Sequence, residues 1–267
     1  MTVAILGAGV MGEALLAGIL QARPASGVLV GEKRPDRAAE LTERYGVEVV
    51  GNAEAVKRAG TVLLVVKPQD VGPLLDEVAA SARPEQVFVS LAAGITTAFV
   101  EERLPEGVAV VRVMPNTPAL VGEGMSVISP GSHSGAEQLD EAEELLRSTG
   151  RVARVPEKQQ DAVTAISGSG PAYVFYVAEA MIEAGVHLGL ARATATELVV
   201  QTLAGSAELL RGTGEHPTVL RERVTSPGGT TAAALRRLDE GGVRAAFLAA
   251  TEAARDRSRA LSAGEPV

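Results

Sequence analysis

A short apolar run at residues 2–6 leads directly into a glycine-rich loop, Gly7-Ala8-Gly9-Val10-Met11-Gly12. In a GxGxxG loop between a strand and a helix, the first glycine allows a tight turn and the second lets the backbone approach a pyrophosphate. The third glycine lets the helix pack closely on the strand. N–H groups at the start of that helix can then bind the phosphates. The loop therefore predicts a dinucleotide site that is formed by Gly7, Gly9, Val10, Met11 and Gly12.

Three charged residues stand about 20 positions further on, where such sites contact the adenosine ribose. Glu32 ends an apolar run and is followed at once by Lys33 and Arg34. A carboxylate would bind the ribose hydroxyls and favour NAD, whereas a Lys-Arg pair supplies the charge that a 2′-phosphate needs and favours NADP. Lys33 and Arg34 could also be solvated loop charges. We predict NADP as the cofactor, with NADPH preferred and NADH also accepted, and assign Lys33 and Arg34 to the site.

Three more segments lie where strands of the predicted sheet end, the edge at which open α/β sheets bind ligands. Lys67 could bind an anion or be an ordinary lysine at a strand end. The small residues 92–93 permit close approach of a nicotinamide ring, or simple packing. Asn116, in the sequence MPNTP, could bind the nicotinamide amide or order its own loop. We assign to the cofactor site Val66, Lys67, Pro68, Ala92, Ala93 and Asn116.

Two glycine motifs in the second half could bind a substrate. In SGSGPAY, Ser169 and Gly170 precede Pro171, which suits the first turn of a helix, and the glycines leave N–H groups for an anion. In SPGGTT, the backbone from Gly228 onward can direct N–H groups at a carboxylate, helped by the dipole of the helix that follows. Helix capping is the alternative role for the hydroxyls. The predicted substrate-binding residues are Ser169, Gly170, Ser226, Gly228, Gly229, Thr230 and Thr231.

Composition excludes other classes of function. The chain has 25 basic and 33 acidic residues, a net charge of −8, and no dense Lys/Arg cluster, so nucleic acid is not an expected partner. Cysteine is absent, which excludes thiolate chemistry and agrees with a cytoplasmic location. The three histidines have no ligand-spaced partners, so we expect no metal. No apolar run reaches the roughly 18 residues of a spanning helix, so no membrane association is expected.

The elements that must position these residues change character along the chain. Up to about residue 155, short β-branched runs alternate with amphipathic stretches, the pattern of βαβ units around a mostly parallel sheet. Beyond Pro156 the sequence predicts helices, and the segment 171–210 is apolar over more than one helical face. We predict an α/β fold: a Rossmann-like doubly wound domain at 1–155 and an all-helical dimerisation and substrate-binding domain at 156–267. The apolar helices predict a homo-oligomer.

The motifs GAGVMG, VKP, MPNTP, SGSGPAY and SPGGTT, in this order, resemble the pyrroline-5-carboxylate reductases from end to end. The resemblance implies hydride transfer from NAD(P)H to the C=N bond of 1-pyrroline-5-carboxylate, which gives L-proline in the last step of proline biosynthesis. It implies that Thr231 is catalytic and reaches the imine nitrogen. It also implies a homodimer with the active site at its interface, assembled into larger rings. Many relatives carry an Asn-Arg pair in place of the Glu32-Lys33-Arg34 segment, which leaves the cofactor preference open.

Two other functions share part of these motifs. The β-hydroxyacid dehydrogenases also combine a GxGxMG loop with a helical domain, but they use a helix-borne lysine, and the matching segment at residues 171–181 has none. A dinucleotide-binding sensor without activity is the second rival. The intact SGSGPAY and SPGGTT segments speak against it.

Overall fold

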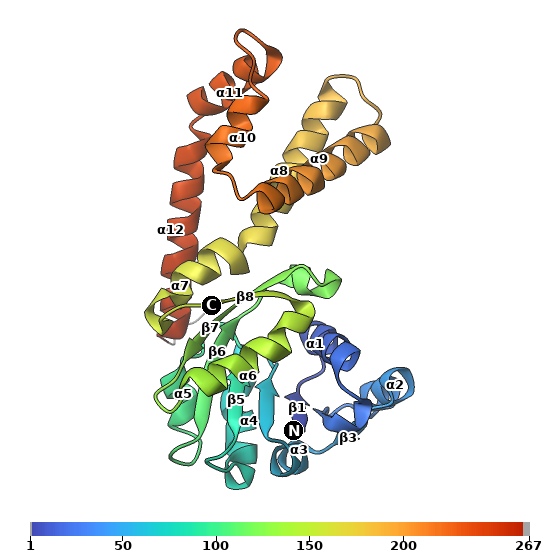
Figure 1. Ribbon diagram of the computed structural model, residues 1–267, viewed down its shortest axis with the longest axis vertical. Helices are drawn as coiled ribbons and strands as arrows, with labels where there is room; N and C mark the ends of the chain where they lie inside the picture. Colours follow the sequence, from blue (N-terminus) through green and yellow to red (C-terminus); the bar gives the residue numbers. More distant parts are fainter. Residues whose placement is uncertain (1, 264–267) are drawn as a thin grey trace. The chain divides into compact units, whose positions relative to one another are not determined.

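A computed structural model describes residues 2–263 of the chain, which divide into two compact units (Figure 1). The first unit is the chain up to Ser169 together with the end of α12 (Val243–Ser262), from Ala254 on. The second unit is Gly170–Ala253. The predicted domain division after residue 155 stays a prediction, because these units reflect internal packing alone.

The first unit is built on one eight-stranded sheet with the order β3-β2-β1-β4-β5-β6-β7-β8. All neighbouring strands are parallel except β6 and β7, so the mostly parallel sheet that the sequence predicts is confirmed. The strand order reverses between β1 and β4. The strands are β1 (Val3–Leu6), β2 (Val28–Gly31), β3 (Glu48–Val50), β4 (Thr61–Leu64), β5 (Val87–Ser90), β6 (Ala109–Met114), β7 (Gly124–Pro130) and β8 (Gly150–Arg154).

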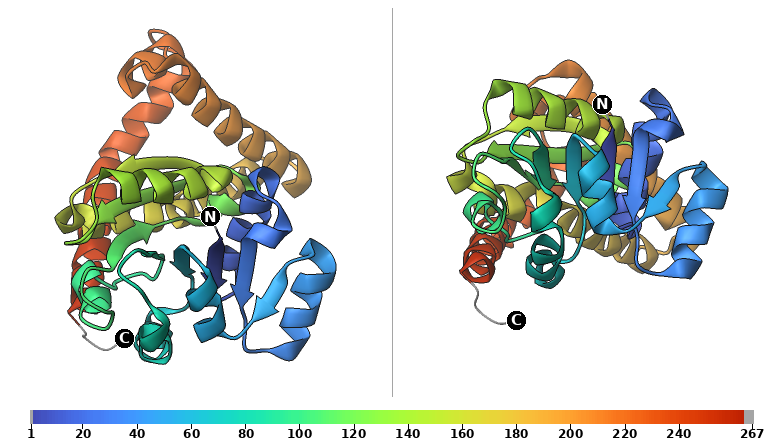
Figure 2. Two further views of the ribbon diagram at one scale, coloured as in Figure 1. Left: turned by 60° about the horizontal axis from the view of Figure 1, so that its bottom comes forward. Right: turned by 90° about the horizontal axis from the view of Figure 1, so that it is seen from below.

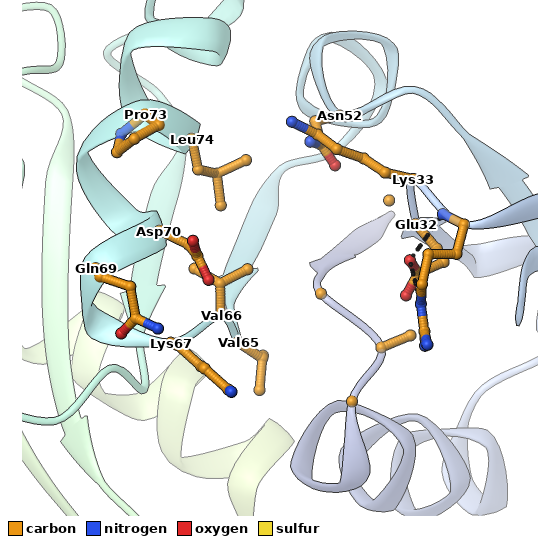
Figure 3. Close-up of a pocket in the computed structure, with 15 residues that line it drawn as sticks. Glu32, Lys33, Asn52, Val65, Val66, Lys67, Gln69, Asp70, Pro73 and Leu74 are labelled. Atoms are coloured by element: carbon orange, nitrogen blue, oxygen red, sulfur yellow. Dashed lines mark hydrogen bonds and ion pairs between the residues drawn. The ribbon is translucent and has the colours of Figure 1, made fainter.

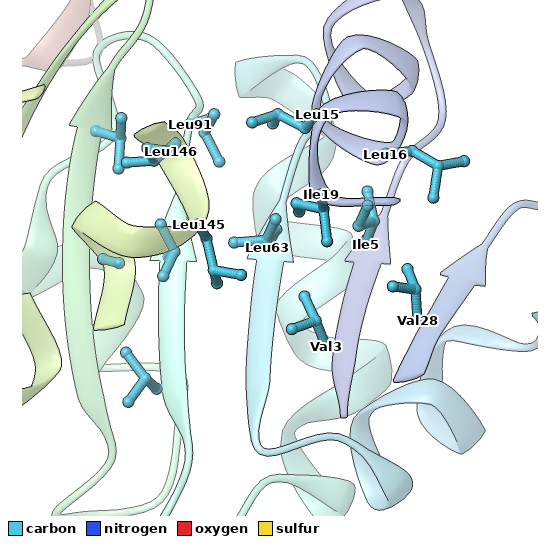
Figure 4. Packing of buried hydrophobic residues seen from close by; sticks show 14 of the residues in the cluster. Val3, Ile5, Leu15, Leu16, Ile19, Val28, Leu63, Leu91, Leu145 and Leu146 are labelled. Atoms are coloured by element: carbon cyan, nitrogen blue, oxygen red, sulfur yellow. The ribbon is translucent and has the colours of Figure 1, made fainter. Parts of the chain in front are cut away.

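Helices cover both faces of this sheet, as two further views show (Figure 2). On one face, leucines of α1 and α6 pack over β1 and β4 (Figure 4). On the other face, α3, α4 and α5 bury a second apolar cluster around Phe88. Strands buried on both faces explain why their sequences are continuous apolar runs. The helices of this unit are α1 (Val10–Ala22), α2 (Pro35–Tyr45), α3 (Asn52–Arg58), α4 (Pro68–Val78), α5 (Thr97–Glu101), α6 (Ala136–Leu146) and α7 (Gln160–Val163).

The second unit is helical, as predicted. Its helices are α8 (Gly170–His187), α9 (Arg192–Thr213), α10 (Pro217–Arg223), α11 (Thr230–Glu240) and the first part of α12. Large apolar side chains stand exposed on them, with Phe175 and Leu248 both 67% exposed and Tyr176 74% exposed. A monomer of this size rarely leaves so many large apolar groups in water. Within residues 2–263, no helix combines the length and the apolar composition needed to cross a membrane.

Candidate active site

A cleft of about 660 Å³ opens at the carboxyl edge of the sheet, beside the ends of β1, β2 and β4 (Figure 3). This is the point where the strand order reverses, which is where doubly wound sheets bind ligands. Its volume suits a cofactor of dinucleotide size. The residues that line it are Gly7, Ala8, Gly9, Gly31, Glu32, Lys33, Arg34, Asn52, Val65, Val66, Lys67, Gln69, Asp70, Pro73 and Leu74.

The three glycines of the loop differ in what surrounds them. Gly7 has a φ of 97°, and a Cβ there would overlap the backbone of Val65. A Cβ at Gly12 would overlap the carbonyl oxygen of Gly7. A Cβ at Gly9, in contrast, would meet nothing within 4 Å. Gly7 and Gly12 are therefore required by the fold, whereas the space beside Gly9 is open and fits a pyrophosphate that approaches the backbone.

The charged residues at the end of β2 are partnered among themselves and with α4. The Glu32 side chain is only 11% exposed, and its Oε1 accepts the backbone N–H of Arg34 at 3.0 Å. The Arg34 guanidinium lies 3.5 Å from the same oxygen. Lys33 Nζ pairs with Glu77 Oε2 at 2.8 Å, and Asn52 donates to the other oxygen of Glu77. The Glu32 carboxylate is thus held in place, while the two cations project from the rim.

Six of the predicted cofactor residues line the cleft: Gly7, Gly9, Lys33, Arg34, Val66 and Lys67. The remaining ones are not among the residues that line it. Val10, Met11 and Gly12 form the first turn of α1, and Pro68 is the first residue of α4. Ala92 is buried and Ala93 is exposed, directly after β5.

Asn116 follows β6, and both the nitrogen and the oxygen of its side-chain amide form hydrogen bonds within the first unit. Its Nδ2 donates to the carbonyl of Ser167 at 3.1 Å, and its Oδ1 accepts the N–H of Met125 at 2.8 Å. Ser167 belongs to a π-helical turn at Thr164–Gly168, immediately before Ser169 and the start of α8. Asn116 could bind the nicotinamide amide or order its own loop, and these bonds support the ordering of the loop.

Replacing Asn116 with alanine should therefore lower stability more than cofactor affinity. Loss of the side chain leaves the Met125 N–H and the Ser167 carbonyl without partners, at a cost of about 1 to 3 kcal/mol each where they are buried. Denaturant unfolding of Asn116→Ala, paired with NADPH titration, measures both effects. A large loss of NADPH affinity with unchanged stability would favour direct binding of the nicotinamide instead.

The SPGGTT segment forms the turn before α11. Gly228 has a φ of 69°, and a Cβ at Gly229 would overlap the hydroxyl of Ser226. Gly229 is the N-cap of α11, and no side chain caps this helix. The first N–H groups of α11, on Thr230 and Thr231, therefore have no side-chain partner at the cap and can bind an anion. Gly170 is the first residue of α8, but this helix continues directly from the π-helical turn. Ser169 has a helical backbone, and its N–H already donates to the Thr164 carbonyl at 2.8 Å, so the free N–H groups expected before Pro171 do not include that of Ser169.

The prediction missed part of the cleft wall. Asn52 is 6% exposed at the start of α3, and its Oδ1 occupies the space that a side chain at position 31 would need. A polar residue two positions after the third predicted strand was a usable signal for it. The first turns of α4 supply four more, which only the tertiary structure identifies: Gln69, Asp70, Pro73 and Leu74. Ala8, Gly31 and Val65 also line the cleft without having been assigned to it.

Known protein families match both the N-terminal and the C-terminal part of the chain. Residues 157–261 match a family model described as pyrroline-5-carboxylate reductase dimerisation. Residues 2–94 match one described as NADP oxidoreductase, coenzyme F420-dependent. A pyrroline-5-carboxylate reductase of Corynebacterium melassecola is 46% identical, over 97% of this chain and 98% of the relative.

Two solved structures share the complete fold. A pyrroline-5-carboxylate reductase from Coxiella burnetii matches with a TM-score of 0.93 and 34% identity, over 97% of this chain and 98% of that one. The Plasmodium falciparum pyrroline carboxylate reductase with NADP bound matches with a TM-score of 0.86 and 29% identity, over 98% of both chains.

Proposed function

This chain belongs to the pyrroline-5-carboxylate reductase family, and from that membership we propose that it reduces the C=N bond of 1-pyrroline-5-carboxylate to give L-proline. It is an NAD(P)H-dependent oxidoreductase. The observation that carries the proposal is a match over 97% of the chain to a relative of that name, in a protein whose cleft lies at the sheet's switch point. Turnover of 1-pyrroline-5-carboxylate by the purified protein tests it.

One group of residues is assigned to the dinucleotide and a second group to the substrate. The loop of Gly7, Gly9 and Gly12 with the start of α1 binds the dinucleotide, and a reduced nicotinamide supplies the hydride when it is bound there. The uncapped N–H groups of Thr230 and Thr231 bind the substrate carboxylate, aided by the dipole of α11. The remaining substrate contacts are assigned to Ser169, Gly170, Ser226, Gly228 and Gly229.

Thr231 is the proposed catalytic residue. Its hydroxyl forms a hydrogen bond with the ring nitrogen, which keeps the C=N carbon electrophilic. The N-cap of α11 is Gly229, so the Thr231 hydroxyl is not used as the helix cap. A cyclic alkyl imine binds a proton readily near neutral pH, so no stronger general acid is required. Most of the rate then comes from positioning and from exclusion of water.

NADPH is the proposed preferred donor. Glu32 is engaged by the N–H and the guanidinium of Arg34, which leaves its carboxylate poorly placed to accept ribose hydroxyls. The Lys33 and Arg34 side chains are 74% and 63% exposed. The Lys33–Glu77 ion pair lies at the surface, where such a pair contributes about 0 to 1 kcal/mol, and the Arg34 guanidinium lies 3.5 Å from Glu32. A 2′-phosphate would bind both cations more strongly than these carboxylates do.

The double change Lys33→Ala with Arg34→Ala should lower kcat/KM for NADPH by about 10- to 100-fold, since two charge-assisted contacts are lost. The value for NADH, which lacks the 2′-phosphate, should stay within about threefold. Steady-state kinetics with both donors measures this. Arg151→Ala is the matched control, because Arg151 is an exposed cation on β8, at the far edge of the sheet from β2. Equal losses for both donors would refute the assignment.

The protein is a homo-oligomer, and the finer assembly is part of the proposal: a homodimer with the active site at its interface, joined into a larger ring. The exposed apolar groups of α8 and α12 support burial by a second copy. A cytoplasmic location is proposed as well, and the absence of cysteine supports it. Light scattering on purified protein measures the number of subunits.

A further inference from the structure

Arg37, in the first turn of α2, reaches back to the glycine loop. Its side chain is 14% exposed, and its Nε donates to the carbonyl of Ala8 at 3.3 Å. The two terminal nitrogens donate to Glu40, at 2.6 Å, and to Glu13 in the first turn of α1. Arg37 does not line the cleft. Its planar guanidinium therefore joins α2, α1 and the loop from behind the site.

The bond to Ala8 sets the direction of a neighbouring donor. The peptide that joins Ala8 to Gly9 is trans, so its C=O and its N–H point in opposite directions. Because the Ala8 carbonyl is held toward Arg37, the Gly9 N–H faces away from Arg37. Gly9 is also the residue beside which the space is open. Gly9 lines the cleft, so the anchored carbonyl fixes the direction of an N–H on the wall of the proposed dinucleotide site.

Arg37 also compensates a carboxylate at an unfavourable place. Glu13 lies one turn into the helix whose N-terminus must attract phosphates. The hydrogen bond from Arg37, followed by that from Tyr45, holds the pKa of Glu13 below its usual range, so this group is a fixed anion. Arg44 donates to the same carboxylate at 2.7 Å. Arg37 alone among these partners contacts both the carboxylate and the loop.

We propose that Arg37 is a positioning residue of the dinucleotide site, which holds the Ala8 carbonyl so that the Gly9 N–H faces the pyrophosphate. The inference rests on the proposed cofactor site and extends it to a residue outside the cleft. NADPH and NADH share the pyrophosphate. Arg37 therefore contributes equally to both, unlike Lys33 and Arg34.

The test is fluorescence titration of Arg37→Met with NADPH and with NADH, in the absence of any imine. Both dissociation constants should rise by about tenfold, and their ratio should stay within about twofold, because one charge-assisted hydrogen bond behind the shared phosphates is lost. At saturating NADPH, kcat should stay within about twofold of the wild-type value. Arg37→Lys keeps the positive charge but lacks the planar guanidinium with its several N–H donors. It should therefore recover part of the dinucleotide affinity that Arg37→Met loses.

Arg44→Met is the matched control, since it removes a cation from Glu13 without touching Ala8. Its dissociation constants should stay within about twofold of wild type. A loss confined to NADPH would make Arg37 a ligand of the 2′-phosphate and overturn the proposal. Equal losses in Arg44→Met and Arg37→Met, or none in Arg37→Met at a temperature where it is folded, would also overturn it. Binding is measured without substrate, so failure of the wild type to reduce the imine leaves this test intact.

Discussion

Thr231→Val is expected to lower kcat/KM for 1-pyrroline-5-carboxylate by about 10- to 1000-fold, which corresponds to about 1.4 to 4 kcal/mol of transition-state stabilisation. Valine keeps the shape of threonine and removes only the hydroxyl that is proposed to bond the ring nitrogen. Because α11 is not capped by a side chain, the change removes no cap from the helix. Steady-state kinetics at saturating NADPH measures the effect.

Thr231→Ser is the companion variant, because it retains the hydroxyl at the same position of α11. It should stay within about fivefold of the wild type. If serine loses as much activity as valine, a hydroxyl at position 231 is not sufficient, and the loss in valine cannot be assigned to the hydrogen bond alone. Unchanged kinetics in Thr231→Val would remove Thr231 from the mechanism.

Gly9→Ala is expected to weaken cofactor binding strongly while leaving the fold intact. A Cβ at this position would meet no atom of the protein within 4 Å. The backbone φ of Gly9 is −69°, which any residue can adopt. The added methyl group would occupy the space through which the pyrophosphate reaches the loop. NADPH affinity should fall by about 100-fold or more, which corresponds to about 2.7 kcal/mol or more.

Gly135→Ala is the matched control for this change. Gly135 is likewise an extended N-cap glycine, at the start of α6, and its Cβ would make only an ordinary contact with Gln138. Both variants should unfold at similar denaturant concentrations, since each places alanine at an N-cap. Only Gly9→Ala should lose NADPH in a titration. Retained affinity in Gly9→Ala would place the pyrophosphate elsewhere.

The local patterns of the sequence were sufficient to predict the sheet and most helices. Strands such as β1 and β4 are buried on both faces, so their apolar runs stand out from the amphipathic helices between them. Two short helices, α5 and α10, were not predicted. They have five and seven residues, so a period of 3.6 residues is barely repeated within either of them.

The cofactor site was predictable as far as its chemistry is local. The glycine loop and the charges after β2 carry their meaning in their spacing, and the structure brings both to one cleft. Arg37 was missed because its role depends on which carbonyl it reaches, 29 residues away in the chain. The sequence does not decide between the two roles of Asn116 for the same reason, since its partner Ser167 is 51 residues away. Long-range hydrogen bonds of this kind leave no periodic trace in a sequence.

Steady-state oxidation of NADPH, and separately of NADH, by the purified protein with 1-pyrroline-5-carboxylate is the most direct test of the proposed function. It is followed through nicotinamide absorbance, with dinucleotide binding measured on the same sample. We predict rapid turnover with a higher kcat/KM for NADPH than for NADH. A folded protein that binds a dinucleotide and yet reduces the imine with neither donor would contradict the proposed reaction.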